Sequence, residues 1–253
     1  MGVAFSKVTE PGIHRSFAYR AAAATALSPM RVLTRSDWRG LENLPDSGCV
    51  VAVNHISYID PFAVAQMLYD NGHPPFFLAK DGLFRLPVLG RWLAATGQVP
   101  VYRGTGKAIS AYTDAVAAVR AGKTIVVMPE STITQDPDLW PMRAKTGVVR
   151  IALATGCPLV PLGQWGAQEL MPRGTKRLRP WPRRTMQMSV GPAVDLSDFS
   201  GDTVDHDSLV VAGDRVMDAI TAQVAVLRGD PPPQGRWDRA RGRRVVTRAE
   251  ESP

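Results

Sequence analysis

Short apolar runs alternate along the chain with longer segments whose apolar residues recur at helical spacing. The runs at residues 49–54 and 124–128 have the length and the β-branched content of buried strands. Residues 107–121 instead repeat their apolar side chains three and four positions apart, as one face of a helix requires. This alternation predicts an α/β sheet with crossover connections. The predicted strands cover residues 49–54, 76–80, 97–102, 124–128, 158–163 and, at a sheet edge, 185–190; the predicted helices cover residues 61–70, 83–96, 107–121, 145–155 and 204–228.

The chain of 253 residues is long enough for one α/β domain. Over residues 37–228 we expect a mixed, largely parallel central sheet flanked by helices. Residues 1–36 are predicted to be an N-terminal amphipathic segment that associates with a membrane. Residues 229–253 are predicted to be a flexible, disordered basic tail, because three consecutive prolines precede a run of charges.

The formal net charge is +7, and the cations gather in two stretches. Residues 173–184 hold six cations and no acid, and residues 236–248 hold six arginines and one aspartate. Neither stretch matches a folded nucleic-acid motif, so no nucleic-acid partner is expected. Attraction to anionic lipid headgroups and a plain solvated surface remain the two interpretations.

Other simple features narrow the class of protein. The chain lacks the long apolar run of a transmembrane helix, and the short apolar stretch at residues 21–27 lacks a cleavage site for a signal peptide. Cys49 and Cys157 lie in apolar, strand-like segments. They indicate buried thiols in a reducing, cytosolic compartment, and neither a disulfide nor a metal site is expected.

The most informative segment follows the first predicted strand, where His55 precedes Asp60-Pro61. A histidine can accept a proton near neutral pH, and a neighbouring carboxylate can fix its tautomer. Asn54 is expected to brace the turn, and Ser57 to cap it or contact substrate. Because Asp-Pro is also a common helix N-terminus, a purely capping role for Asp60 stays open.

Further polar residues end other predicted strands: Arg103, Glu130 and the Gly163-Gln164 pair. Arginine suits a phosphate or a carboxylate, and a glutamate at a strand end can accept hydrogen bonds from a polyol. Lys145, at a predicted helix start, adds a cation. The carboxyl ends of strands in an open α/β sheet meet at one edge, which favours a single site over unrelated surface loops.

These blocks, in this order, resemble the glycerolipid acyltransferase family, which includes lysophosphatidic acid acyltransferases. The resemblance spans about residues 40–195. The matching segments are residues 54–61 for the family's His-x4-Asp signature, residues 99–104 for its second block, residues 129–132 for its Pro-Glu-Gly-Thr block and residues 160–162 for its strand with an embedded proline.

The resemblance implies an O-acyltransferase that esterifies a lysophospholipid, with 1-acylglycerol-3-phosphate as the expected acceptor and phosphatidic acid as the product. His55, oriented by Asp60, would deprotonate the acceptor hydroxyl, which would attack the thioester of acyl-CoA or acyl carrier protein. Glu130 would bind the glycerol portion, and Arg103 the phosphate. Ser131, Thr132 and Lys145 are further expected substrate-binding residues. No metal or other cofactor is implied.

Two positions depart from the family pattern. Its glycine in the third block is Ser131 here, and an arginine that commonly follows is Ile133. Loss of a charge-assisted contact removes about 1.5–3 kcal/mol from phosphate binding. Either Lys145, Arg103 or Arg143 compensates, or the phosphate of the acceptor is masked by a headgroup or absent. In the second case the acceptor is another lysophospholipid or a glycolipid sugar.

Both substrates carry long chains, so a membrane contact is expected. Phe84, Arg85, Arg91 and Trp92 have the composition of an interfacial segment, although an ordinary amphipathic helix packed on the sheet would look the same. We expect a peripheral protein on the cytoplasmic face of the cell membrane, in contact with anionic lipids.

Two other classes remain open. The same His-Asp pair could hydrolyse an acyl thioester with water, although the lack of a Gly-x-Ser-x-Gly motif argues against a serine hydrolase. The chain could also be a non-catalytic basic protein that binds membranes or nucleic acid.

Overall fold

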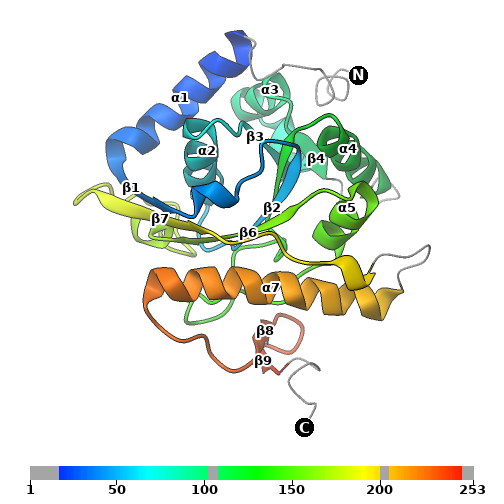
Figure 1. Cartoon of the computed structure of the whole chain (residues 1–253). Coiled ribbons are helices and arrows are strands. Elements are labelled where there is room, and N and C mark those ends of the chain that lie inside the picture. Colours follow the sequence, from blue (N-terminus) through cyan, green and yellow to red (C-terminus); the bar gives the residue numbers. More distant parts are fainter. Residues whose placement is uncertain (1–16, 102–107, 200–204, 247–253) are drawn as a thin grey trace.

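A seven-stranded sheet forms the centre of the computed structural model (Figure 1), which describes residues 17–101, 108–199 and 205–246. The strand order is β1-β7-β6-β2-β5-β3-β4, and neighbours are parallel except for the antiparallel pair β6 and β7. The predicted mixed, largely parallel sheet is confirmed. Its strands are β1 (Thr34–Arg39), β2 (Cys49–Val53), β3 (Pro75–Lys80), β4 (Val99–Val101), β5 (Thr124–Val127), β6 (Leu159–Trp165) and β7 (Arg184–Val190).

Helices cover both faces of this sheet (Figure 1), with α7 along one face and α1 and α2 over the other. The central strand β2 is buried on both sides, which explains its unbroken apolar run. Val50 and Ala52 pack in the cluster that contains α7, whereas Val51 and Val53 pack with α2. The helices are α1 (Phe17–Leu33), α2 (Asp60–Asp70), α3 (Pro87–Ala95), α4 (Ala108–Arg120), α5 (Gly147–Thr155), α6 (Ala167–Leu170) and α7 (His206–Arg228), with short 3-10 turns η2 (Leu41–Asn43), η3 (Asp81–Arg85) and η4 (Ser197–Phe199).

The sheet edge differs from the prediction. The sequence pattern places residues 185–190 at an edge, but β1 pairs in parallel with β7 and lies outside it. Only Thr34 of β1 is buried, so no apolar run marks this strand in the sequence. The edge assignment is therefore wrong because a polar edge strand carries too weak a pattern to be recognised.

The N-terminal helix α1 packs on the α/β domain through Tyr19, Ala23, Leu27 and Met30, which are buried in the same clusters as the sheet residues. Helix α1 therefore shares two hydrophobic clusters with the domain that is predicted to begin at residue 37. None of the described helices combines the length and apolarity needed to span a bilayer.

The predicted flexible tail is wrong for residues 236–246. There β8 (Arg236–Asp238) and β9 (Arg243–Val245) form an antiparallel hairpin, which Figure 1 shows beyond α7. Buried Arg236 pairs with Asp214 and Asp218 of α7. The arginine-rich composition suggested solvation, whereas the acidic partners lie far away along the chain. Residues 247–253 lie outside the described part.

Candidate active site

Three of the predicted strand-end residues, His55, Glu130 and Gln164, meet at the carboxyl edge of the sheet, where the neighbouring strands β2, β5 and β6 end. The backbone N–H of His55 donates to Oε1 of Glu130 (2.8 Å), and the backbone N–H of Gln164 donates to Oδ1 of Asn54 (2.8 Å). The fourth residue, Arg103, lies outside the described residues, so its place is not defined.

His55 and Asp60 form a hydrogen-bonded pair, with 2.7 Å between His55 Nδ1 and Asp60 Oδ2. The same carboxylate oxygen accepts the backbone N–H groups of Ile56 (2.6 Å) and Ser57 (2.8 Å). Asp60 is therefore more than a helix cap: it closes the turn around the histidine, and the N-cap position of α2 belongs to Ile59. A carboxylate opposite Nδ1 makes that nitrogen the donor and leaves Nε2 as the acceptor.

The side chains of His55 and Asp60 differ in how far they are exposed to solvent. The Asp60 side chain is fully buried, whereas 17% of the His55 side chain is exposed. Burial raises the pKa of Asp60, and the hydrogen bonds from His55, Ser57 and Ile56 oppose that rise. Asp60 thus accepts a hydrogen bond from the imidazole inside the protein, while the partly exposed imidazole lines the cavity described below.

Glu130 has a different place from the one predicted. Its Oε1 accepts the N–H of His55 and its Oε2 accepts the N–H of Met142 (3.0 Å). The side chain is buried and is absent from the residues lining the cavity described below. Burial raises the pKa of Glu130 to about 8, and the two amide bonds oppose this rise. Glu130 therefore positions the His55 backbone, which corrects the expectation that it binds the glycerol portion.

Asn54 and Ser57 brace the turn that carries His55 from its other side. Asn54 is fully buried and exchanges three hydrogen bonds with Gln164, including Asn54 Nδ2 to the Gln164 carbonyl (3.1 Å) and Gln164 Nε2 to the Asn54 carbonyl (2.8 Å). Ser57 Oγ donates to the carbonyl of Met171 (2.7 Å). These contacts fix the ends of β2 and β6 relative to each other.

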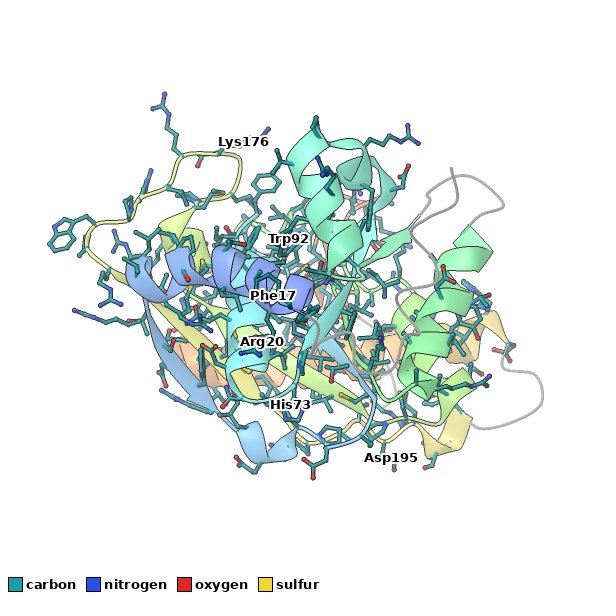
Figure 2. All side chains as sticks on the ribbon, turned by 90° about the horizontal axis from the view of Figure 1, so that it is seen from above. Phe17, Arg20, His73, Trp92, Lys176 and Asp195 are labelled. Carbon is teal, nitrogen blue, oxygen red and sulfur yellow. The ribbon has the colours of Figure 1, made fainter. Side chains whose placement is uncertain are left out.

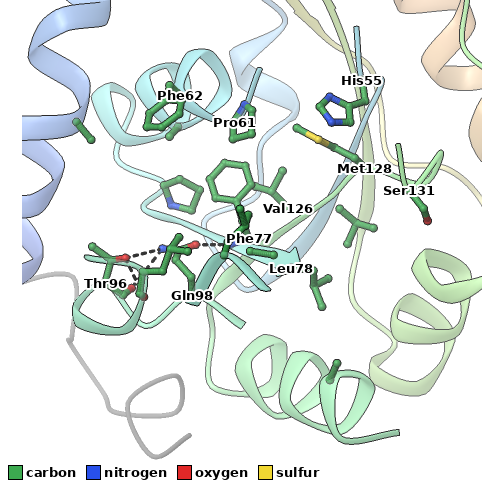
Figure 3. A pocket seen from close by; sticks show the side chains of 18 of the residues that line it. His55, Pro61, Phe62, Phe77, Leu78, Thr96, Gln98, Val126, Met128 and Ser131 are labelled. Atoms are coloured by element: carbon green, nitrogen blue, oxygen red, sulfur yellow. Dashed lines mark hydrogen bonds between the residues drawn. The ribbon is translucent and has the colours of Figure 1, made fainter. Parts of the chain in front are cut away.

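A cavity of about 600 Å³ opens beside His55 (Figure 3). His55 lies at one end, and Thr96 and Gln98 lie at the other, with Phe77 and Val126 between them. At the far end, Gln98 Oε1 accepts the Phe77 N–H (2.7 Å) and its Nε2 donates to Thr96 Oγ1 (3.2 Å). Further apolar side chains come from α1, α2, η3 and α3, among them Leu27, Phe62, Tyr69, Leu83 and Leu93.

Sequence reasoning missed this apolar lining. Its members repeat at helical spacing and are indistinguishable in sequence from ordinary core residues. No group of three or more His, Cys, Asp or Glu side chains suited to a metal ion occurs among the residues that the structure describes.

A family model described as Acyltransferase matches residues 35–165 of the chain. The chain belongs to the acyltransferase family. It is 32% identical over 145 residues to BAT2, a chloroplastic 1-acyl-sn-glycerol-3-phosphate acyltransferase of Brassica napus. The aligned region covers 56% of this chain and 40% of that protein. It is 31% identical over 125 residues to a 1-acyl-sn-glycerol-3-phosphate acyltransferase of Borreliella burgdorferi, covering 49% of this chain and 48% of that protein. The chain thus spans less than half of the length of either relative.

The fold also matches a solved structure. The 1-acyl-sn-glycerophosphate (LPA) acyltransferase PlsC from Thermotoga maritima superposes with a TM-score of 0.62 at 22% identity, over 87% of this chain and 80% of that one. The resemblance to the glycerolipid acyltransferases is therefore confirmed at the level of family and fold.

In this member of the acyltransferase family the third block has a strained backbone. Ser131 has φ +60°, in the left-handed region that glycine adopts without strain. This explains why a glycine suits the position. Ser131 and Lys145 both line the cavity, and the backbone N–H of Lys145 donates to the Pro129 carbonyl (2.9 Å). Thr132 is half-buried and is not among the cavity residues.

The four residues predicted to contact a membrane differ in exposure. Arg85 and Arg91 are exposed, and Arg85 pairs with Asp81 (3.0 Å). Phe84 is half-buried. Trp92 faces inward: its indole N–H donates to the carbonyl of Ala22 in α1 (3.1 Å), and its ring lines the cavity. Trp92 therefore joins α3 to α1, and its predicted membrane contact stays a prediction.

Proposed function

We propose that the protein transfers a fatty acyl group from an acyl thioester to the free hydroxyl of 1-acylglycerol-3-phosphate and thereby forms phosphatidic acid. The observation that carries this proposal is the His55–Asp60 pair at the end of an otherwise mostly apolar cavity. The Brassica napus and Borreliella burgdorferi relatives are both 1-acyl-sn-glycerol-3-phosphate acyltransferases, which supports the choice of acceptor.

In the proposed reaction, His55 Nε2 accepts the proton of the acceptor hydroxyl as the oxygen attacks the thioester carbonyl. Asp60 stabilises the imidazolium through its hydrogen bond to Nδ1. The tetrahedral intermediate then expels the thiolate, which takes the proton back from Nε2. General base catalysis of this kind contributes about 10²–10⁴ in rate. No cofactor takes part, and the donor is acyl-CoA or acyl carrier protein.

The cavity suits the apolar portion of such a substrate. Its volume of about 600 Å³ falls within the range of ligand sites, and its lining between His55 and Gln98 is mainly apolar. Among the described residues that line the cavity, Lys145 is the only lysine or arginine, so we assign it to the acceptor phosphate. Arg103 is proposed as its partner there on the basis of the sequence alone.

The proposed reaction has one lipid acceptor and one lipid product, so we place it at a membrane surface. The chain would work as a peripheral protein on the cytoplasmic face. The exposed basic residues support this placement through attraction to anionic lipids.

The test uses the purified full chain with acyl-CoA, with and without 1-acylglycerol-3-phosphate, and follows both thiol release and phosphatidic acid. We expect thiol release that requires the acceptor, and a loss of about 10²–10⁴ in kcat for His55→Ala. His206→Ala, which changes an exposed histidine at the start of α7, should keep full turnover. Acceptor-independent thiol release would indicate a thioesterase, and full turnover in His55→Ala would remove the proposed base.

A further inference from the structure

The loop between α6 and β7 presents an unusual combination of exposed side chains. Trp181 is 83% exposed and Leu178 is 47% exposed. Between them and just before them lie the exposed cations Lys176, Arg177 and Arg179, which form no ion pair among the described residues. Leaving a tryptophan in water is unfavourable, and indole rings prefer the boundary between an apolar and an aqueous phase.

No acid balances these cations locally, because residues 170–194 contain none. The other two arginines nearest the loop tip use their guanidinium groups on the backbone. Arg173 donates to the carbonyls of Thr134 (2.9 Å) and Asp136 (2.7 Å), and Arg183 donates to the carbonyl of Arg31 (3.0 Å). The base of the loop is therefore fixed, while its tip presents uncompensated positive charge.

This loop is joined to the catalytic turn. The carbonyl of Met171, at the start of the loop, accepts the hydroxyl of Ser57. The backbone N–H of Thr134, whose carbonyl Arg173 binds, donates to the carbonyl of His55 (2.7 Å). A surface that binds the loop would therefore hold the catalytic end of the cavity close to itself.

A second exposed apolar segment lies on the same side of the molecule. Figure 2 shows the loop with Lys176 and the helix α3, which carries Trp92, projecting toward the same edge. Leu86, which lies between η3 and α3, and Val88, in the first turn of α3, are both exposed, Val88 to 83%. Two separate segments thus offer apolar side chains beside cations, which fits an extended anionic lipid surface better than a small ligand.

From these observations we infer that residues 176–181 form a membrane-docking loop, in which Trp181 and Leu178 enter the headgroup region and Lys176, Arg177 and Arg179 bind anionic headgroups. The Leu86–Val88 segment is the second contact. The inference deepens the proposed function, since it names the surface through which the enzyme would reach lipid substrates.

The test measures sedimentation of the full chain with vesicles of phosphatidylcholine, with or without one third phosphatidylglycerol, in the absence of substrate. We expect binding to the anionic vesicles and little binding to phosphatidylcholine alone. Reversing the three cations (Lys176→Glu, Arg177→Glu, Arg179→Glu) should weaken this binding about 100-fold or more. Trp181→Ala should weaken it about tenfold.

The matched control reverses three exposed arginines of the C-terminal hairpin, Arg239, Arg241 and Arg243, to glutamate. This changes the net charge equally and should leave most of the vesicle binding in place. Equal losses in both triple variants, or wild-type binding that ignores phosphatidylglycerol, would overturn the docking loop. Binding of the loop to an RNA oligonucleotide in preference to the vesicles would do the same.

Failure of the docking loop and failure of the proposed function can be told apart. His55→Ala should bind vesicles like the wild type although it is inactive. The loop variants should keep their turnover of short-chain, water-soluble donor and acceptor. If the wild type binds anionic vesicles but transfers no acyl group, the docking loop stands and the proposed function fails.

Discussion

The C-terminal hairpin provides the most quantitative prediction. Arg244 on β9 binds Asp136 through two hydrogen bonds of 2.7 Å each, and it also reaches Oδ2 of Asp138 at 2.6 Å. The Asp136 side chain is 1% exposed and that of Arg244 is 27% exposed. Arg244→Ala would therefore leave a buried carboxylate without its main cationic partner.

Removing one partner of a fully buried ion pair destabilises a protein by about 3–5 kcal/mol. The partial exposure of Arg244 reduces this, and the contact with the largely exposed Asp138 adds little. We expect Arg244→Ala to lower the free energy of unfolding by about 2–3 kcal/mol. Arg244→Lys should recover part of the loss, since an ammonium cannot reproduce the two-pronged contact.

The measurement is urea unfolding followed by circular dichroism, with Arg243→Ala as the control. Arg243 is an exposed neighbour on the same strand, and its removal should change stability by less than about 0.5 kcal/mol. A double-mutant cycle with Asp136→Asn should give a coupling of at least about 1 kcal/mol. Equal stabilities for Arg244→Ala and Arg243→Ala would refute the view that the hairpin is part of the folded domain.

Three further predictions concern the region around the site. Burial raises the pKa of Glu130 from 4.5 to about 8, so the folded state binds the proton of this carboxyl group more tightly than the unfolded state does. The stability that this proton contributes is complete below pH 4.5 and is lost as the pH rises through about 8. Glu130→Gln should flatten this fall in the free energy of unfolding, measured by urea unfolding at a series of pH values. Ser131→Gly should raise the free energy of unfolding by about 0.5 kcal/mol, because it relieves the left-handed backbone, and an unchanged or lower Tm would contradict this. Gly163→Ala should lower it by about 1–3 kcal/mol, since the new Cβ would lie 2.6 Å from Cβ of Gln223 on α7; a variant as stable as the wild type would show that α7 can move.

The sequence predicts the parts of this protein that are encoded locally. The buried strand β2 and the pair His55 and Asp60 lie within a dozen residues, so both the strand and the turn that brings imidazole and carboxylate together can be recognised. The strand ends converge because parallel strands share an edge, which is a property of the fold class. The alternation of strands and helices therefore predicts the fold and the place of the site.

The parts that the sequence does not predict depend on partners far apart in the chain. Glu130 follows a strand end, so the sequence suggests that it is available to substrate. In the structure, however, the backbone N–H of Met142 donates to its Oε2. Arg236 and Arg244 look solvated until Asp214 and Asp136 are found beside them. No local pattern distinguishes a charged residue with such a partner from one without it.

The support of His55 shows what these distant contacts do. The backbone N–H of His55 donates to Glu130, and its carbonyl accepts the N–H of Thr134. Residues of the segment 130–142 therefore bind both backbone polar groups of the histidine. That segment is in turn held by arginines from later in the chain. Arg173 binds two of its carbonyls, Arg244 binds two of its aspartates, and Arg228 lies over the ring of Trp140 at 4.2 Å while donating to the Asp138 carbonyl.

All three of these arginines lie beyond residue 165, where the match to the family model ends. The turn that carries His55 and Asp60 is thus encoded in the shared region, whereas the segment that fixes it is held by residues outside that region. A change in Arg228 or Arg244 should therefore reach His55 through residues 130–142 without touching the cavity. Arg244→Ala assayed well below its unfolding midpoint should show a lower kcat with a similar KM for the acceptor. A raised KM with an unchanged kcat would place the effect of the hairpin on acceptor binding instead.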